Sequence, residues 1–280
     1  MNHNLFKPTY LKELCQEYDL IPSKKYGQNY LISDVPIKKM LESADVKKTD
    51  TIVEIGPGFG VLTFALAEKA NKVVAFEIER KLEKYWEEVA PKNVEVVWGN
   101  ALKEFVYRSQ EFGKYKVLAN LPYQITSNVL RIILETENKP ESVTVMVQKE
   151  VAERIVAKPG DMSILAVSVQ YYGVPKIVCK TSSGSFWPSP KVDSAVLHIR
   201  LSTIDCRTSD FDQMFFKVVR AGFSSKRKQL WRNLSEGLKI DGGKIKELLV
   251  EIIGNEKVRA QELSVDNWVV ITETLEHLNT

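Results

Sequence analysis

The chain has 280 residues, 44% of them hydrophobic, so it can bury a full core as one large domain or as two unequal ones. Its net charge of +3 is too small to indicate a partner, and the local distribution of charge matters more. The three cysteines are widely spaced, which argues against a disulfide framework or a zinc site. No signal-peptide pattern is visible, and no apolar run approaches the roughly 18 residues of a membrane span. We therefore expect a cytoplasmic monomer with no membrane segment and no metal.

The first helical pattern covers residues 5–20. Residues 24–31 follow, with a glycine, two lysines and two amides, and this pattern alone indicates a surface turn. Asp34 and Pro36 then predict the start of a helix that runs to about Ala44, because Asp is a common N-cap and Pro is tolerated in the first turn.

Residues 51–63 are predicted to form the first unit of a nucleotide-binding α/β domain. They begin with a β-branched strand pattern, continue with glycines at every second position from 56 to 60, and end in a helical pattern. At Gly56 and Gly58 the absence of a Cβ allows a tight turn and lets a ligand lie against the backbone, although such a turn can also be purely structural. The dinucleotide fingerprint would need glycine where this chain has Val61, so the pattern favours S-adenosylmethionine over NAD.

The second strand is expected over residues 72–78, a helix over 80–89, and the third strand over 94–98. Glu77 lies at the end of the second strand, where an acidic residue can accept hydrogen bonds from ribose hydroxyls. A solvated strand end is the alternative for Glu77. Asn100 follows the third strand and is predicted to contact an adenine ring.

The fourth predicted strand, residues 115–119, runs directly into Asn120-Leu121-Pro122-Tyr123. This tetrapeptide suits methylation of an exocyclic amine, whose nitrogen is a poor nucleophile. The Asn120 side-chain oxygen and a backbone carbonyl of Leu121 or Pro122 can accept its two N–H bonds. Pro122 stiffens the turn, and Tyr123 offers a ring face for an extruded base. A turn with a buried tyrosine is the alternative.

The remaining elements of the first domain complete an α/β fold. A loop at 186–193 with two prolines and two aromatic residues is predicted to be stiff and to lie near the target base. The other elements are helices over 127–134, 149–156 and 162–172, and strands over 143–148, 176–180 and 194–201, the last two as an antiparallel pair.

Beyond about residue 204 only helical patterns remain, over 209–221, 225–236, 242–253 and 264–278, with Ser264 as a plausible N-cap. The prediction is a catalytic domain over residues 1–203 and a small helical RNA-binding domain over 204–280. Positive charge gathers at the start of the second domain, in a run that contains no acidic residue, with Phe223 and Trp231 interleaved. A solvated helix face is the alternative. The predicted RNA contacts are Lys191, Lys226, Arg227, Lys228 and Arg232.

These motifs, in this order and over nearly the whole chain, closely resemble the ribosomal RNA adenine dimethyltransferases, and the bacterial small-subunit members in particular. The matching stretches are Lys25-Tyr26-Gly27-Gln28-Asn29-Tyr30-Leu31, Glu54-Ile55-Gly56-Pro57-Gly58, Phe76-Glu77, Asn120-Leu121-Pro122-Tyr123, and residues 188–196 and 223–234. The resemblance implies a Rossmann-like S-adenosylmethionine-dependent methyltransferase domain followed by a small helical domain. It implies cofactor contacts at Asn29, Leu31, Gly56, Gly58, Glu77, Asn100 and Asn120, so residues 29–31 become cofactor contacts instead of a surface turn.

The chain departs from the family pattern in two places. Asn100 stands where the family usually has an acidic residue, and an amide can still accept one hydrogen bond from the cofactor's adenine. The turn over residues 158–162 looks shorter than the family's usual segment.

The resemblance implies dimethylation of two adjacent adenines in the 3′-terminal hairpin of 16S rRNA, with the small-subunit rRNA of an assembling 30S particle as the partner. One alternative is Erm-type methylation of 23S rRNA, which residues 188–193 and the basic segment fit less well. Another is a catalytically silent RNA-binding assembly factor on the same fold. The intact Asn120, Pro122 and Tyr123 argue against that third function.

Overall fold

The computed structural model describes residues 3–22, 28–202 and 209–278, and its contacts divide the chain into two units. The first unit comprises residues 1–152 and 174–201, and the second comprises residues 153–173 and 202–280. The boundary predicted between residues 203 and 204 lies outside the described residues. The units differ from the predicted domains in one respect, because residues 153–173 group with the C-terminal helices.

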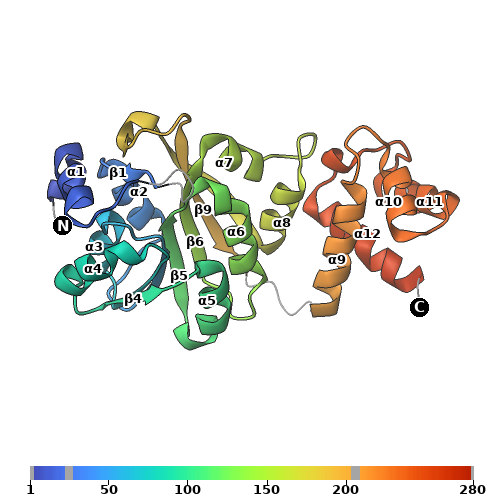
Figure 1. Ribbon diagram of the computed structural model, residues 1–280. Helices are drawn as coiled ribbons and strands as arrows, with labels where there is room; N and C mark the ends of the chain where they lie inside the picture. The colour runs from blue at the N-terminus through green and yellow to red at the C-terminus, as the bar shows by residue number, and fades with distance from the viewer. Residues whose placement is uncertain (1–2, 23–27, 203–208, 279–280) are drawn as a thin grey trace. The chain divides into compact units, whose positions relative to one another are not determined.

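The first unit is built on a seven-stranded sheet with the order β4-β3-β2-β5-β6-β9-β7 (Figure 1). The five strands from β4 to β6 are parallel, and β9 pairs antiparallel with β6. Val73, Val117 and Val145 are fully buried in three of these strands. The strands are β2 (Thr51–Ile55), β3 (Lys72–Glu77), β4 (Val94–Trp98), β5 (Tyr115–Asn120), β6 (Ser142–Gln148), β7 (Gly173–Thr181) and β9 (Ser194–Leu201). All seven were predicted, and the bounds of β4 and β9 agree to the residue.

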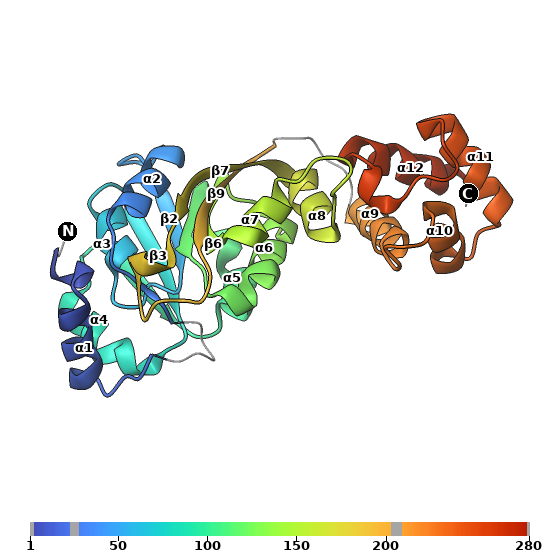
Figure 2. The ribbon, with the colours of Figure 1, turned by 90° about the horizontal axis from the view of Figure 1, so that it is seen from above.

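Helices cover both faces of this sheet, with α2 and α3 on one face and α5 and α6 on the other (Figure 2). Their bounds are α2 (Val35–Ser43), α3 (Val61–Ala67), α4 (Glu83–Val89), α5 (Ala101–Arg108), α6 (Thr126–Glu135) and α7 (Lys149–Ile155). Asp34 precedes α2 as predicted, but its side chain makes no capping hydrogen bond. It forms an ion pair with Lys38 at 2.5 Å, so its carboxylate turns along the helix surface instead of back to the first amides.

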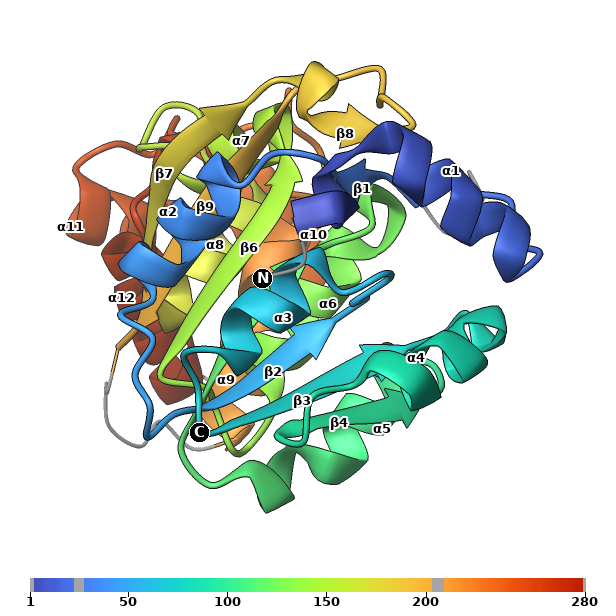
Figure 3. The same cartoon turned by 90° about the vertical axis from the view of Figure 1, so that its left-hand side faces the viewer.

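The N-terminal segment contributes to the same core. Helix α1 (Pro8–Glu17) buries Leu11 and Leu14 there. After it, β1 (Tyr30–Leu31) pairs antiparallel with β8 (Phe186–Trp187) as a separate two-stranded sheet (Figure 3). The loop predicted over 186–193 therefore begins as a short strand, and the pairing joins two segments that are far apart in the sequence.

The second unit is helical and has its own core. Phe215, Leu234 and Trp268 are fully buried in it, and Ala166 and Val167 of α8 join them. The helices are α8 (Ile164–Tyr172), α9 (Ser209–Gly222), α10 (Leu230–Leu238), α11 (Gly242–Ile253) and α12 (Val265–Leu278). The N-cap prediction for α12 is confirmed by Ser264, whose Oγ accepts the Asn267 N–H at 3.1 Å.

The helix predicted over 225–236 was wrong at its start. Helix α10 begins at Leu230, and residues 223–229, here named the basic loop, form a turn. The buried Asn233 explains the break, because its Nδ2 donates to the Gly222 carbonyl at 2.6 Å and to the Ser225 carbonyl at 2.9 Å. These carbonyls are held by a side chain of the next helix, so the backbone turns instead of continuing as a helix.

Candidate active site

One pocket lies where the parallel strands of the first unit end. The last residues of β2, β3 and β5 line it, together with the residues that follow β4. All ten residues predicted for cofactor binding and catalysis are among its walls: Asn29, Leu31, Gly56, Gly58, Glu77, Asn100, Asn120, Leu121, Pro122 and Tyr123. Lys25, Tyr26 and Gly27 of the first matching stretch lie outside the described residues.

The glycine turn after β2 needs glycine for two reasons. Gly58 has a φ of +55°, which is strained for other residues, and a Cβ there would come within 3.1 Å of the Tyr30 ring. The turn is also held from α4, where Trp86 Nε1 donates to the Gly58 carbonyl at 3.0 Å and Tyr85 Oη donates to the Phe59 carbonyl at 2.8 Å. A rigid backbone concavity therefore faces the pocket.

Glu77 connects this turn to the end of β3. Its Oε2 accepts the Gly58 N–H at 3.0 Å, and its Oε1 accepts the N–H groups of Ile78 and Glu79, both at 2.8 Å. Burial raises the pKa of Glu77, and these three hydrogen bonds oppose the rise. Among the described residues Oε2 accepts one hydrogen bond, from Gly58, so it has a further lone pair that a hydroxyl group in the pocket could use.

Glu54 is a pocket residue to which the sequence analysis gave no role. Its side chain is 1% exposed, and burial raises its pKa from 4.5 to about 8. Its Oε2 has no hydrogen-bond partner among the described residues. A buried, unpaired carboxyl oxygen beside a ligand pocket is a candidate polar contact, and its position two residues before Gly56 was the available signal.

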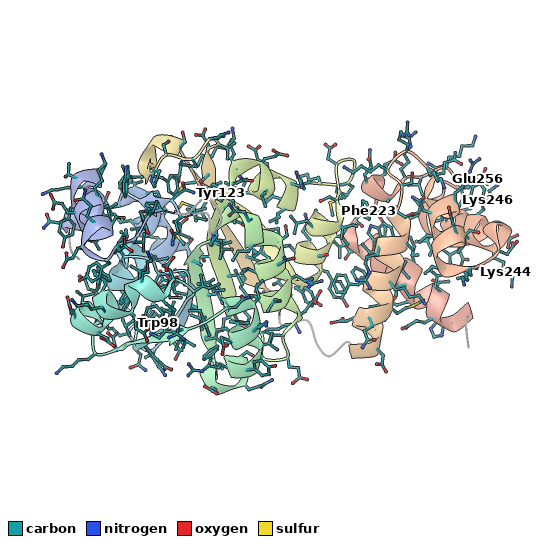
Figure 4. All side chains as sticks on the ribbon, viewed as in Figure 1. Trp98, Tyr123, Phe223, Lys244, Lys246 and Glu256 are labelled. Carbon is teal, nitrogen blue, oxygen red and sulfur yellow. The ribbon has the colours of Figure 1, made fainter. Side chains whose placement is uncertain are left out.

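Asn100 lines the pocket as predicted, and it also caps a helix. Its Oδ1 accepts the Leu102 N–H at 3.0 Å at the start of α5. The capping bond leaves Oδ1 one further lone pair and leaves the amide nitrogen as a donor. Trp98, which ends β4 just before this turn, lies beneath the Arg80 guanidinium at 5.8 Å (labelled in Figure 4).

Hydrogen bonds fix the orientation of the Asn120 turn. Asn120 Nδ2 donates to the Asn29 carbonyl at 3.4 Å, which leaves Oδ1 as an acceptor for a ligand. The Leu121 N–H donates to the Met146 carbonyl at 3.1 Å and ties the turn to β6. The Pro122 carbonyl already accepts two hydrogen bonds from the residues that follow it. The donors are the Ile125 N–H at 3.2 Å and the Thr126 hydroxyl at 3.3 Å.

Tyr123 is half-buried at the edge of the pocket and is labelled in Figure 4. Its hydroxyl lies 2.7 Å from Oγ of Ser194, the first residue of β9. Burial raises the pKa of the Tyr123 hydroxyl, so the group stays neutral and can donate this hydrogen bond at physiological pH.

The five predicted RNA contacts do not line the pocket. Lys191 belongs to the first unit and the other four to the second unit. The basic loop carries three of them, and α10 carries the fourth. All five side chains are exposed: Lys191, Lys226, Arg227, Lys228 and Arg232.

The two aromatic residues near the basic loop are used in packing. Phe223 stacks on the buried Trp268 with ring centroids 5.5 Å apart, so one face of its ring is covered. The Trp231 Nε1 donates to Gln229 at 2.9 Å, and the Arg232 guanidinium lies 5.1 Å from the Trp231 ring centroid. Positive charge, more than open ring faces, is what this surface offers to a partner.

Sequence reasoning missed the apolar walls of the pocket. Ile37 and Met40 of α2 line it, as do Tyr30 and Phe186 from the paired strands β1 and β8. The one-turn spacing on α2 was a usable signal for the first two. No local signal could place β1 beside β8, because a pairing between distant segments creates their proximity.

The residues present fit S-adenosylmethionine. The glycine turn provides a backbone cradle, Glu77 keeps an acceptor for a ribose hydroxyl, and Ile78 exposes 49% of its surface beside it, as an apolar face for a ring. The Asn120 acceptor faces the same space. Fold and site together define an S-adenosylmethionine-dependent methyltransferase.

The chain belongs to the ribosomal RNA adenine dimethylase family, whose model matches residues 22–277. A relative from Dehalococcoides mccartyi, named ribosomal RNA small subunit methyltransferase A, is 43% identical over 92% of this chain and 89% of its own length. Relatives of the same name from Clostridioides difficile and Alkaliphilus oremlandii are 38% and 35% identical, over 94% and 96% of both chains.

Solved structures agree on the fold. A dimethyladenosine transferase from Plasmodium falciparum matches with a TM-score of 0.76 and 24% identity, over 89% of this chain and 98% of that one. The 23S rRNA methyltransferase ErmE matches with a TM-score of 0.68 and 24% identity, over 88% and 99%. Among the described residues, no helix combines the length and apolar character that crossing a membrane requires.

Proposed function

We propose that this chain dimethylates N6 of two adjacent adenines in the 3′-terminal hairpin of 16S rRNA, acting as a cytoplasmic monomer on an assembling 30S particle. The observation that carries the chemistry is the Asn120–Tyr123 turn, held at the rim of a cofactor pocket by hydrogen bonds to Asn29 and Met146. Relatives that are 35–43% identical and named for the small subunit support this substrate over 23S rRNA.

The turn can make an adenine amine nucleophilic. Conjugation with the ring withdraws the nitrogen's lone pair, and acceptors placed on both N–H bonds return it toward the nitrogen. Asn120 Oδ1 is one acceptor. The Leu121 carbonyl is the better second one, because the Pro122 carbonyl already accepts two hydrogen bonds within the turn.

The remaining residues position the reactants. S-adenosylmethionine, when bound, supplies an electrophilic methyl group. Tyr123 offers a ring face to an extruded base, and base–aromatic stacking contributes about 1–3 kcal/mol. No general base is required, because the amine becomes acidic on methylation and releases its proton to water. The four basic residues of the second unit can neutralise phosphates without reading sequence.

Labelled S-adenosylmethionine distinguishes the candidate substrates. We expect label in immature small subunits and none in large-subunit RNA, with Asn120→Ala transferring no methyl while keeping its fold and much of its RNA affinity. Mass spectrometry of rRNA from a deletion strain is the second arm. Two dimethylated adenines that persist in that strain, with no second methyltransferase present, would refute the proposal.

A further inference from the structure

The hydroxyl of Tyr123 is hydrogen-bonded to a residue of β9. Among the described residues, no backbone hydrogen bond joins the Asn120–Tyr123 turn to this strand. The Tyr123 hydroxyl and Ser194 Oγ are 2.7 Å apart, which is an ideal distance for an O–H···O hydrogen bond. Ser194 is fully buried, whereas Tyr123, which is labelled in Figure 4, is only half-buried and lines the pocket. The bond therefore joins a side chain at the site to an interior anchor.

The anchor is rigid. Ser194 opens β9 opposite Gln148, the last residue of β6. The preceding Asp193 is held twice, because its carbonyl accepts the Lys149 N–H at 2.9 Å and its carboxylate accepts the Ser183 N–H at 3.0 Å. Neither bond depends on the catalytic turn, so the position of Ser194 is set by the sheet.

The backbone tethers of the turn cannot do the same for the ring. The bond from the Leu121 N–H to Met146 fixes the main chain two residues before Tyr123, but it does not select among the staggered rotamers of the Tyr123 side chain. A hydrogen bond at the ring tip selects one direction for the side chain. With the ring fixed, a base that stacks on it has its amino group at a fixed position relative to the Asn120 side-chain oxygen.

We propose that Ser194 is a positioning residue for methyl transfer, which holds the Tyr123 ring where the target adenine stacks. This inference rests on the proposed function. Ser194 itself is absent from the pocket walls, so it acts through Tyr123 and not by touching substrate or cofactor.

A double-mutant cycle tests the inference, with Ser194→Ala, Tyr123→Phe and the pair together. Each single change should lower kcat by roughly ten- to a hundred-fold, the scale of a small misplacement of reacting groups, and leave cofactor affinity unchanged. The pair should be no worse than either single variant, since both remove one interaction. Ser194→Thr keeps the hydroxyl and should recover most of the turnover.

Thr144→Val is the matched control. Thr144 is equally buried on β6 and bonds across to β9 at His198 with a distance of 2.8 Å, away from the pocket. It should change thermal stability but not kcat. Normal kcat in Ser194→Ala, an equal loss in Thr144→Val, or additive losses in the pair would each overturn the inference. If the unmutated protein labelled no small subunits, the proposed function would fail first and take this inference with it.

Discussion

Glu77 performs two tasks with different oxygen atoms. Oε1 is saturated by two backbone N–H groups, and Oε2 holds the glycine turn through Gly58 while keeping a lone pair for the cofactor. The sequence indicated only the second task. The residue therefore supports the turn in addition to the ligand contact predicted for it, and we expect its loss to affect both.

We expect Glu77→Gln to weaken S-adenosylmethionine binding by about 1.5–3 kcal/mol, because an amide nitrogen cannot accept the hydrogen bonds that a carboxylate accepts. Titration calorimetry measures this. Glu79→Gln is the control, since Glu79 accepts only the nearby Lys81 N–H at 3.3 Å and does not line the pocket. Equal affinities in both variants would mean that the cofactor lies elsewhere.

Glu54 gives the folded protein a pH dependence. Its pKa is 4.5 for the ordinary group and about 8 when buried. Between these values the folded state binds a proton that the unfolded state does not, so stability is highest at the acid end and falls as the pH rises. One proton gives a slope of up to about 1.4 kcal/mol per pH unit.

Glu54→Gln should remove that slope, because the amide is neutral at every pH. Urea unfolding of the cofactor-free protein at several pH values across the window measures it. The pKa of Glu77 is also raised, but Glu77 is present in both proteins, so the difference between them isolates Glu54. Exposed Glu87 provides the control change to Gln. An unchanged slope in Glu54→Gln would contradict the assignment.

At the scale of elements, the sequence predicted the strands and turns, whose conformation depends on residues close together in the chain. Buried β-branched runs gave the strands, and Val94–Trp98 was predicted to the residue. Glycines with left-handed backbone and the Asn120 turn are also local, which is why eight of the ten pocket residues could be named from patterns, whereas Asn29 and Leu31 were named only through the family resemblance. The pairing of Tyr30 with Trp187, and the bond from Tyr123 to Ser194, join distant segments and left no local trace.

The start of α10 was also mispredicted because it depends on contacts between residues that are not neighbours in the chain. Residues 225–229 have helical composition, but Asn233 holds the carbonyls of Gly222 and Ser225 and thereby favours a loop. This loop presents Lys226, Arg227 and Lys228 to solvent. One buried amide therefore contributes to the shape of this loop.

Asn233→Ala should loosen the basic loop and weaken binding to small-subunit particles. Two lost hydrogen bonds, each contributing about 0.5–1.5 kcal/mol, should also lower the stability of the second unit. Filter binding at several salt concentrations measures the affinity, and calorimetry should show unchanged cofactor binding. Asn255→Ala is the control, because Asn255 caps a different exposed turn of the same unit. Normal particle affinity in Asn233→Ala would show that the loop's shape is irrelevant to binding.

For the whole molecule, the residues predicted for two different tasks lie in different units. Every predicted cofactor and catalytic residue lies in the first unit, and four of the five predicted RNA contacts lie in the second. Phosphate contacts are weakened by salt through counterion release, whereas a largely apolar cofactor pocket is not. Cofactor binding and particle binding should therefore respond differently to ionic strength.

Because residues 153–173 belong to the second unit, the two units also determine where the chain can be shortened. Within the second unit, Met162, which precedes α8, and Ala166 and Val167 of α8 are buried among the C-terminal helices, and Tyr171 stacks on Phe215 with ring centroids 4.0 Å apart. Removing residues 202–280 alone would leave these apolar side chains uncovered, and such exposed patches promote aggregation.

We expect that shortened chain to be poorly soluble. A version that also replaces residues 153–173 with a glycine–serine linker between Ala152 and Val174 should stay monomeric and bind S-adenosylmethionine as the full chain does. Size-exclusion chromatography and calorimetry compare the two. If the simple truncation were equally soluble and bound the cofactor normally, residues 153–173 would belong with the catalytic domain, as the sequence predicted, and the packing of α8 on the C-terminal helices would contribute little to its stability.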